Sequence, residues 1–203
     1  MILVILPLGK EASEVRQWLV RVAMYTAAST VGAGLLSLLL GLVGSGLHAL
    51  LPAVTYGWVT AIFGVVALVF ALKELNIIKL PAPQIGWQVP KSWMRDSRLF
   101  GNTAYGVVLG AGIFTYIPFA SFYLLLAWEM AAGAVSLRAA LALGMSYGFV
   151  RGLLAVMGGI SMLRGEYPLP LSNWLIAHLG WWHAINGLVL VFVGSFLLGS
   201  FVL

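Results

Sequence analysis

The stretch Gly106–Glu129 reads "GVVLGAGIFTYIPFASFYLLLAWE", which is apolar enough to cross a membrane although Thr115, Tyr116 and Pro118 lie near its middle. Proline has no backbone N–H and its ring clashes with the preceding turn, so a helix is expected to kink or break at this point. Backbone polar groups freed at this depth are tolerated only where protein or water surrounds them. The stretch therefore predicts a helix break at Thr115–Pro118 that faces the protein interior.

The composition of the whole chain agrees with a membrane environment. Of 203 residues, 62% are hydrophobic and 8% are charged, whereas soluble domains contain about 25% charged residues. We therefore expect an all-α fold, a polytopic transmembrane helix bundle that forms a single integral membrane domain over residues 1–203. The chain contains no cysteine, which excludes disulfides and thiolate chemistry within it.

Five segments are long enough to be transmembrane helices, each of which needs about 20 residues. They lie near 20–46, 54–73, 103–128, 138–162 and 173–200. The loop 73–102 contains five basic residues, whereas the turn between the first two segments contains none. Because Lys and Arg mark cytoplasmic loops, we expect a prokaryotic inner (plasma) membrane protein with a cytoplasmic N-terminus, a cytoplasmic loop 73–102 and an outward C-terminus.

Small residues recur at every fourth position in two of these segments. They are Ala33, Ser37, Gly41 and Ser45 in the first segment and Ala140, Gly144, Gly148 and Gly152 in the fourth. This spacing places each set on one helix face, where small side chains let a neighbouring backbone come close. Bundle packing explains both stripes. An inverted repeat is the alternative, because the two helices are expected to run in opposite directions.

A Gly-rich helix, the motif Thr-Tyr-Ile-Pro and a further small-residue helix follow one another after the long loop. This order resembles the CcdA family of cytochrome c biogenesis proteins and the membrane core of DsbD, which have a LysE-like fold of two inverted three-helix repeats. The resemblance implies a partial inverted repeat that lacks the family's first helix and has a face open to a partner subunit. It places Thr115–Pro118 where the family has Cys–Pro. Without a cysteine thiol, the family's passage of reducing equivalents across the membrane cannot be carried over.

Arg151 falls halfway along the segment 138–162, where a charge costs roughly 2.5–3.5 kcal/mol on insertion scales. It should therefore face the bundle interior. The functional hypothesis is a substrate-binding site for an anionic group, formed by Arg151 with Thr115, Tyr116, Pro118 and Tyr147. The alternative is a packing role, in which the guanidinium only ties down freed carbonyls or a tyrosine such as Tyr105, Tyr116 or Tyr147.

The sequence gives little sign of a cofactor. His178 and His183 are weak cofactor-binding candidates, because their five-residue separation does not place both on one helix face. We expect no cofactor and no metal, and contact with haem, quinone or chlorophyll only within a larger complex. No phosphate loop or nucleophile–base pair appears, so we expect neither an enzyme nor a nucleic-acid partner.

Two functions from different classes are left. The first is carrier-like transport of a small, anionic solute, with the site around Arg151. The second is a non-catalytic accessory or scaffold subunit of a larger respiratory or photosynthetic membrane complex. In both cases the expected partners are the lipid bilayer and other membrane subunits or a second copy of the chain.

Overall fold

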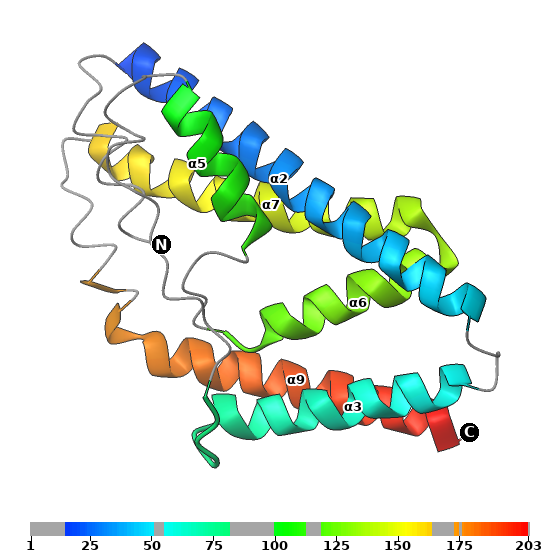
Figure 1. Ribbon diagram of the computed structural model, residues 1–203. Coiled ribbons are helices and arrows are strands. Elements are labelled where there is room, and N and C mark those ends of the chain that lie inside the picture. The colour runs from blue at the N-terminus through cyan, green and yellow to red at the C-terminus, as the bar shows by residue number, and fades with distance from the viewer. Residues whose placement is uncertain are drawn as a thin grey trace. The chain divides into compact units, whose positions relative to one another are not determined.

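The computed structural model describes residues 15–50, 55–81, 100–112, 119–163, 173–174 and 176–202. The regular structure in these ranges is entirely helical, which confirms the predicted all-α class for the described part of the chain (Figure 1). The helices are α2 (Val15–Leu50), α3 (Thr55–Glu74), α5 (Phe100–Ala111), α6 (Ser121–Val135), α7 (Leu137–Leu163) and α9 (Leu179–Val202).

Two helical stretches in the described residues, Trp18–Leu50 and Leu179–Ser200, are long and apolar enough to cross a membrane. The arrangement of five spans stays a prediction. On α9, the large side chains of Leu188, Phe192 and Phe196 are 63%, 74% and 66% exposed. Such a row of exposed apolar side chains is unfavourable in water, whereas acyl chains would cover it.

The segment expected as one span at 103–128 contains two helices. Helix α5 ends at Ala111, and α6 begins at Ser121. Between them, Gly112 has φ 73° and its N–H donates to the Leu109 carbonyl at 3.0 Å. This backbone conformation is open to glycine because it has no Cβ. The predicted break residues Thr115–Pro118 lie outside the described residues, and the helix before them already ends at Ala111.

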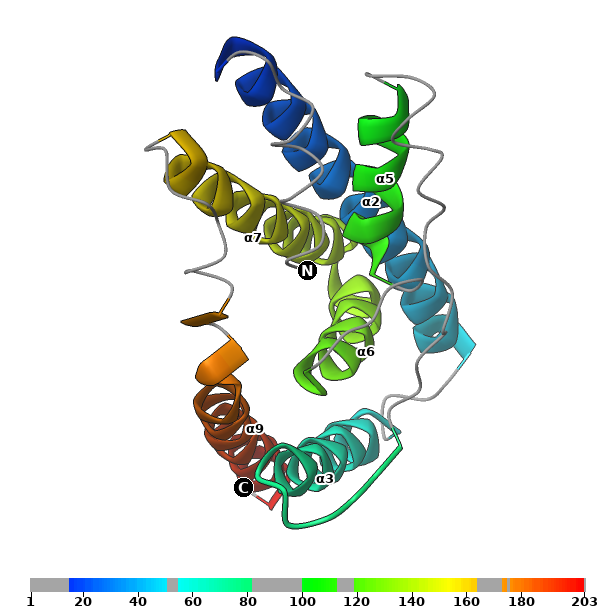
Figure 2. The same ribbon diagram turned by 90° about the vertical axis from the view of Figure 1, so that its left-hand side faces the viewer.

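The helices belong to two compact units, each of which can be followed in Figures 1 and 2. The first unit contains α2 as far as Ser37, all of α5, and α7 from Leu141. The second unit contains α2 from Leu38, then α3, α6, the start of α7 as far as Ala140, and α9.

In the first unit, the predicted small-residue stripes of α2 and α7 face each other. A Cβ added at Gly144 would meet the Ser37 side chain, and one at Gly148 would lie 2.7 Å from the Ala33 Cβ. One turn further on, a Cβ at Gly152 would lie 2.8 Å from the Thr26 Cα. The two backbones are therefore as close as glycine permits.

A polar residue, Ser29, joins α2 to both of its neighbours in this unit. The Ser29 side chain is fully buried, and its Oγ donates to the Gly148 carbonyl of α7 at 3.0 Å. On α5, added Cβ atoms at Gly106 and Gly110 would meet the backbone of Ser29. Helix α2 is thus the element against which both α5 and α7 pack.

In the second unit, α3 and α9 lie side by side in both views. Ala67 and Ala71 of α3 are fully buried and pack with Leu190 of α9 and Leu124 of α6. Two members of the predicted stripes also meet here, because a Cβ added at Gly41 would lie 2.9 Å from the Ala140 Cβ. The last member of the α2 stripe, Ser45, is half-buried, and its Oγ donates to the Leu42 carbonyl at 2.9 Å.

We expect Gly148→Ala to lower the free energy of unfolding by about 1–3 kcal/mol, since the added methyl group would overlap α2 and force the helices apart. The matched control is Gly46→Ala on α2, where an added Cβ has nothing within 4 Å. That substitution should be neutral or stabilise the protein by up to about 1 kcal/mol through helix propensity. Thermal unfolding of both variants in mild detergent is the measurement, and equal midpoints would contradict the packing described above.

Candidate functional site

The buried arginine of α7, Arg151, is 9% exposed. Its Nη1 donates to the Tyr147 hydroxyl at 2.6 Å, and its guanidinium carbon lies 5.9 Å from the centre of the Tyr147 ring. Residues four apart on a helix share a face, so α7 itself aligns the two side chains. The structure therefore brings together two members of the predicted substrate-binding set, while Thr115, Tyr116 and Pro118 lie outside the described residues.

Two further tyrosines complete the surroundings of this guanidinium. Tyr25 on α2 is 2% exposed and interacts electrostatically with Arg151. Tyr105 on α5 interacts with Arg151 electrostatically, and its ring centre lies 6.3 Å from that of Tyr25. Each helix of the first unit thus contributes a tyrosine to an arginine–tyrosine cluster, defined as Arg151, Tyr147, Tyr25 and Tyr105.

Sequence reasoning named three members of this cluster and missed Tyr25. The signal for it was present, because Tyr25 and Ser29 continue the α2 stripe of Ala33 and Ser37 backwards at the same four-residue spacing. The buried tyrosine hydroxyls give the arginine polar partners in an apolar setting, which reduces the cost of its burial. The hydrogen bond from Arg151 to Tyr147 agrees with the packing alternative. The guanidinium is also a cation in a fixed position, to which an anion could bind.

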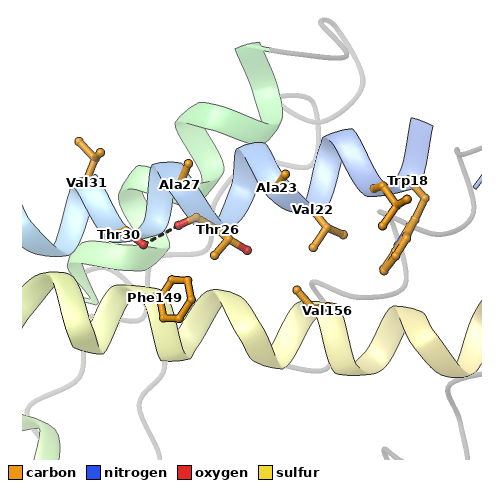
Figure 3. Close-up of a pocket in the computed structure, with 10 residues that line it drawn as sticks. Trp18, Val22, Ala23, Thr26, Ala27, Thr30, Val31, Phe149 and Val156 are labelled. Atoms are coloured by element: carbon orange, nitrogen blue, oxygen red, sulfur yellow. Dashed lines mark hydrogen bonds between the residues drawn. The ribbon is translucent and has the colours of Figure 1, made fainter. Parts of the chain in front are cut away.

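A groove of about 530 Å³ runs along α2 and α7, and its lining is apolar (Figure 3). Figure 3 shows Val22 and Thr26 of α2 facing Phe149 and Val156 of α7, with Trp18 at one end. Arg151 is not among the residues that line the groove. The groove therefore suits an apolar chain rather than a small anionic solute.

A second polar cluster, in the second unit, is centred on Glu74. This glutamate is 5% exposed and is the last residue of α3. Its Oε1 accepts the backbone N–H of Ala120 at 2.6 Å, and its Oε2 lies 2.6 Å from Nδ1 of His183 on α9. Phe119 lies against the same histidine, with ring centres 5.1 Å apart. We call Glu74, His183 and Ala120 the carboxylate–histidine cluster.

The end of α3 explains how Glu74 reaches this position. Asn76 has φ 60°, and the N–H groups of Asn76 and Ile77 donate to the carbonyls of Lys73 and Leu72 at 3.0 and 2.9 Å. This pair of bonds is the Schellman motif, which stops a helix with a left-handed residue. Because the left-handed residue Asn76 ends the helix directly after Glu74, the carboxylate lies at the end of α3 and can reach the start of α6.

Sequence reasoning missed Glu74. It placed Arg21 at the start of the first segment and Glu129 near the outer face, whereas both are buried, at 6% and 2% exposure. Glu74 falls at the beginning of the predicted loop 73–102. The available signal was an ionisable residue within or at the end of an apolar helix, which usually marks a partnered or functional position.

The two histidines proposed as weak cofactor candidates have different surroundings. His183 belongs to the carboxylate–histidine cluster, whereas His178 lies just before α9 and its carbonyl accepts the N–H of Trp182 at 3.2 Å. Among the described residues, no group of three or more His, Asp or Glu is arranged to hold a metal ion.

The chain is similar to the methylamine utilization protein MauF of Paracoccus versutus, with 30% identity over 138 residues. The match covers 66% of this chain and 49% of MauF, so the chain spans about half the length of this relative. No protein-family model matches the chain, and no solved structure matches it.

We expect Tyr147→Phe to lower the free energy of unfolding by about 1–3 kcal/mol, because a buried charged donor loses its acceptor. Tyr105→Phe is the matched control, since it keeps the ring beside Tyr25 and removes a hydroxyl that interacts with Arg151 electrostatically, without a hydrogen bond between them. Thermal unfolding in detergent compares the two variants. An equal or larger loss for Tyr105→Phe would contradict the assigned hydrogen bond.

Proposed function

We propose that this chain is a non-catalytic membrane protein that supports methylamine utilization by binding partner proteins. The observation that carries the proposal is the match to MauF, whose name assigns it to methylamine utilization. The match runs over 138 residues, so it is not confined to a short motif. It favours the accessory-subunit alternative in a modified form, with the respiratory or photosynthetic complex replaced by a methylamine-utilizing system.

The buried polar groups support a binding role over a catalytic one. Arg151 donates a hydrogen bond to the Tyr147 hydroxyl, and Glu74 is engaged by the Ala120 N–H and by His183. Such contacts fix helices against one another in an apolar environment. They leave the groove beside Thr26 and Phe149 as an apolar surface.

A membrane location is part of the proposal. The two long apolar helical stretches and the exposed Leu188, Phe192 and Phe196 of α9 support it. The placement in a prokaryotic inner membrane, with the N-terminus in the cytoplasm, rests on the distribution of Lys and Arg in the sequence.

The resemblance to CcdA-type domains is kept as part of the proposal in a restricted form. Thiol–disulfide exchange requires a thiolate, and the chain has no cysteine. A CcdA-like frame in this chain would therefore act through the surfaces it presents and not through redox chemistry of its own.

Carrier-like transport of a small anion is the second candidate, and one observation favours it. Arg151 is a buried cation on a helix packed at close range, which is the kind of residue that marks substrate pathways in membranes. If this reading holds, the positive charge at position 151 is required for the biological role.

Deletion of the gene in its own host should slow growth on methylamine several-fold and leave growth on succinate with ammonium unchanged. Complementation then separates the two candidates. The partner-binding role predicts that Arg151→Lys and Arg151→Met both restore growth when they accumulate to the parent level, whereas a carrier requires the cation and fails with Arg151→Met.

Unchanged growth of the deletion strain on methylamine would overturn the proposal. So would purification of the tagged chain, after chemical crosslinking in intact cells and extraction in mild detergent, only as a monomer or dimer.

A further inference from the structure

The apolar groove of the first unit follows α2 from Trp18 to Val31 and is completed on the α7 side by Phe149 and Val156 (Figure 3). All of these residues belong to the same compact unit. The residues that line the groove include no charged side chain. The groove is open along its side, because Val31 and Phe149 are 52% and 49% exposed. An open apolar surface of this kind is suited to an apolar occupant.

The two threonines of the lining add little polarity to the groove. Oγ1 of Thr30 donates to the Thr26 carbonyl at 2.8 Å, so this hydroxyl is satisfied within α2. Oγ1 of Thr26 is buried within the chain. An occupant would therefore be held by the burial of apolar surface and by dispersion contacts rather than by hydrogen bonds.

The groove is too narrow to hold a helix. Trp18 and Val31 are 13 residues apart, which is about 20 Å along a helix. A volume of about 530 Å³ spread over that length leaves a mean cross-section of roughly 27 Å². A helix with its side chains is about 10–12 Å wide, so its cross-section is roughly 80–110 Å². A single file of methylene groups, which keeps about 3.5–4.0 Å from its neighbours, fits instead.

The length of the groove matches one leaflet of a bilayer. Half of a bilayer, with its headgroups, is about 20–22 Å thick. Trp18 lies at one end of the groove, and tryptophan favours the headgroup layer. The Lys and Arg residues of α2 are Arg16 and Arg21, and both lie in its first two turns, at the Trp18 end. This distribution favours an anionic headgroup at that end, because basic residues attract the phosphates of anionic lipids.

We propose that the groove binds one acyl chain of an anionic phospholipid, with the headgroup at the Trp18 end and the chain directed towards Val31. This inference rests on the membrane location that is part of the proposed function, and it adds a ligand to it. The bound chain fills the space beside the contact of α2 with α7, where a Cβ added at Gly152 would lie 2.8 Å from the Thr26 Cα.

Native mass spectrometry tests the proposal by counting the lipids that the full chain holds. The chain is purified in mild detergent, delipidated and mixed with dipalmitoyl phosphatidylglycerol. Ala27→Phe fills the groove, because Ala27 lines it and is exposed, so the added ring extends away from the interior of the unit. Ala142→Phe is the matched control, since Ala142 is exposed on α7 and is not among the lining residues.

The parent and Ala142→Phe should each keep one lipid per chain after the detergent is removed, and the occupancy of Ala27→Phe should be several-fold lower at the same lipid concentration. Dihexanoyl phosphatidylglycerol, which has the same headgroup on short chains, should bind the parent several-fold less. If Ala27→Phe does not fold, Ala23→Phe is used, because it lies one turn away in the same lining. Equal occupancy of the parent and the groove variant, equal binding of the short-chain lipid, or no lipid on the parent would overturn the proposal.

This result is separable from the role in methylamine utilization, because the lipid count is read on the purified chain. Unchanged growth of the deletion strain on methylamine would overturn that role and leave the lipid count as it stands. Recovery of the chain in the soluble fraction without detergent would overturn the membrane location and the lipid site together. If Ala27→Phe keeps its lipid but loses a partner protein that crosslinks to the parent in cells, the groove belongs to that partner and the lipid proposal is overturned.

Discussion

The close approach of α2 to α7 and α5 is the constraint on which the first unit depends. In lipid no hydrophobic force drives helices together, so their association relies on dense packing and on hydrogen bonds between helices. Ser29 provides both, since its hydroxyl binds the Gly148 carbonyl and its backbone lies against Gly106 and Gly110. The arginine–tyrosine cluster follows from this contact. Tyr25 lies one turn before Ser29 and Arg151 three residues after Gly148, so packing of the small residues brings the two polar side chains together.

In the second unit, a different kind of contact holds the start of α6. There the contact is made by an acidic side chain, Glu74, whose two oxygens bind separate elements. Among the described residues, the buried arginine and glutamate side chains of the first unit are Arg21 and Arg151, whereas those of the second unit are Glu74 and Glu129. The first unit therefore buries basic residues and the second unit acidic ones, which supports separate roles for their polar clusters.

The sequence could predict what depends on local pattern. Helical class, the apolar stretches of α2 and α9, and the four-residue stripes all follow from spacing along one helix. It could not predict that α5 ends at Ala111. The chain contains many glycines, and nothing in the sequence marks Gly112 as the one that adopts the left-handed conformation. Pro118 was the stronger local signal for a helix end. Nor could it predict the bond between Glu74 and Ala120, which are 46 residues apart. Contacts of this kind depend on how helices pack and do not produce a periodic pattern in the sequence.

The most direct measurement of the central claim is disulfide crosslinking across α2 and α7 in native membranes. A Cβ added at Gly34 would lie 2.9 Å from the Met145 Cγ, so Gly34→Cys with Met145→Cys places two thiols together and replaces the bulky methionine. Gly34→Cys with Ser146→Cys is the matched control, because position 146 points to another face of α7. The packing described here predicts an efficient crosslink within one chain for the first pair and little for the second. Equal crosslinking of both pairs, or none for the first while both thiols react with a maleimide, would contradict it.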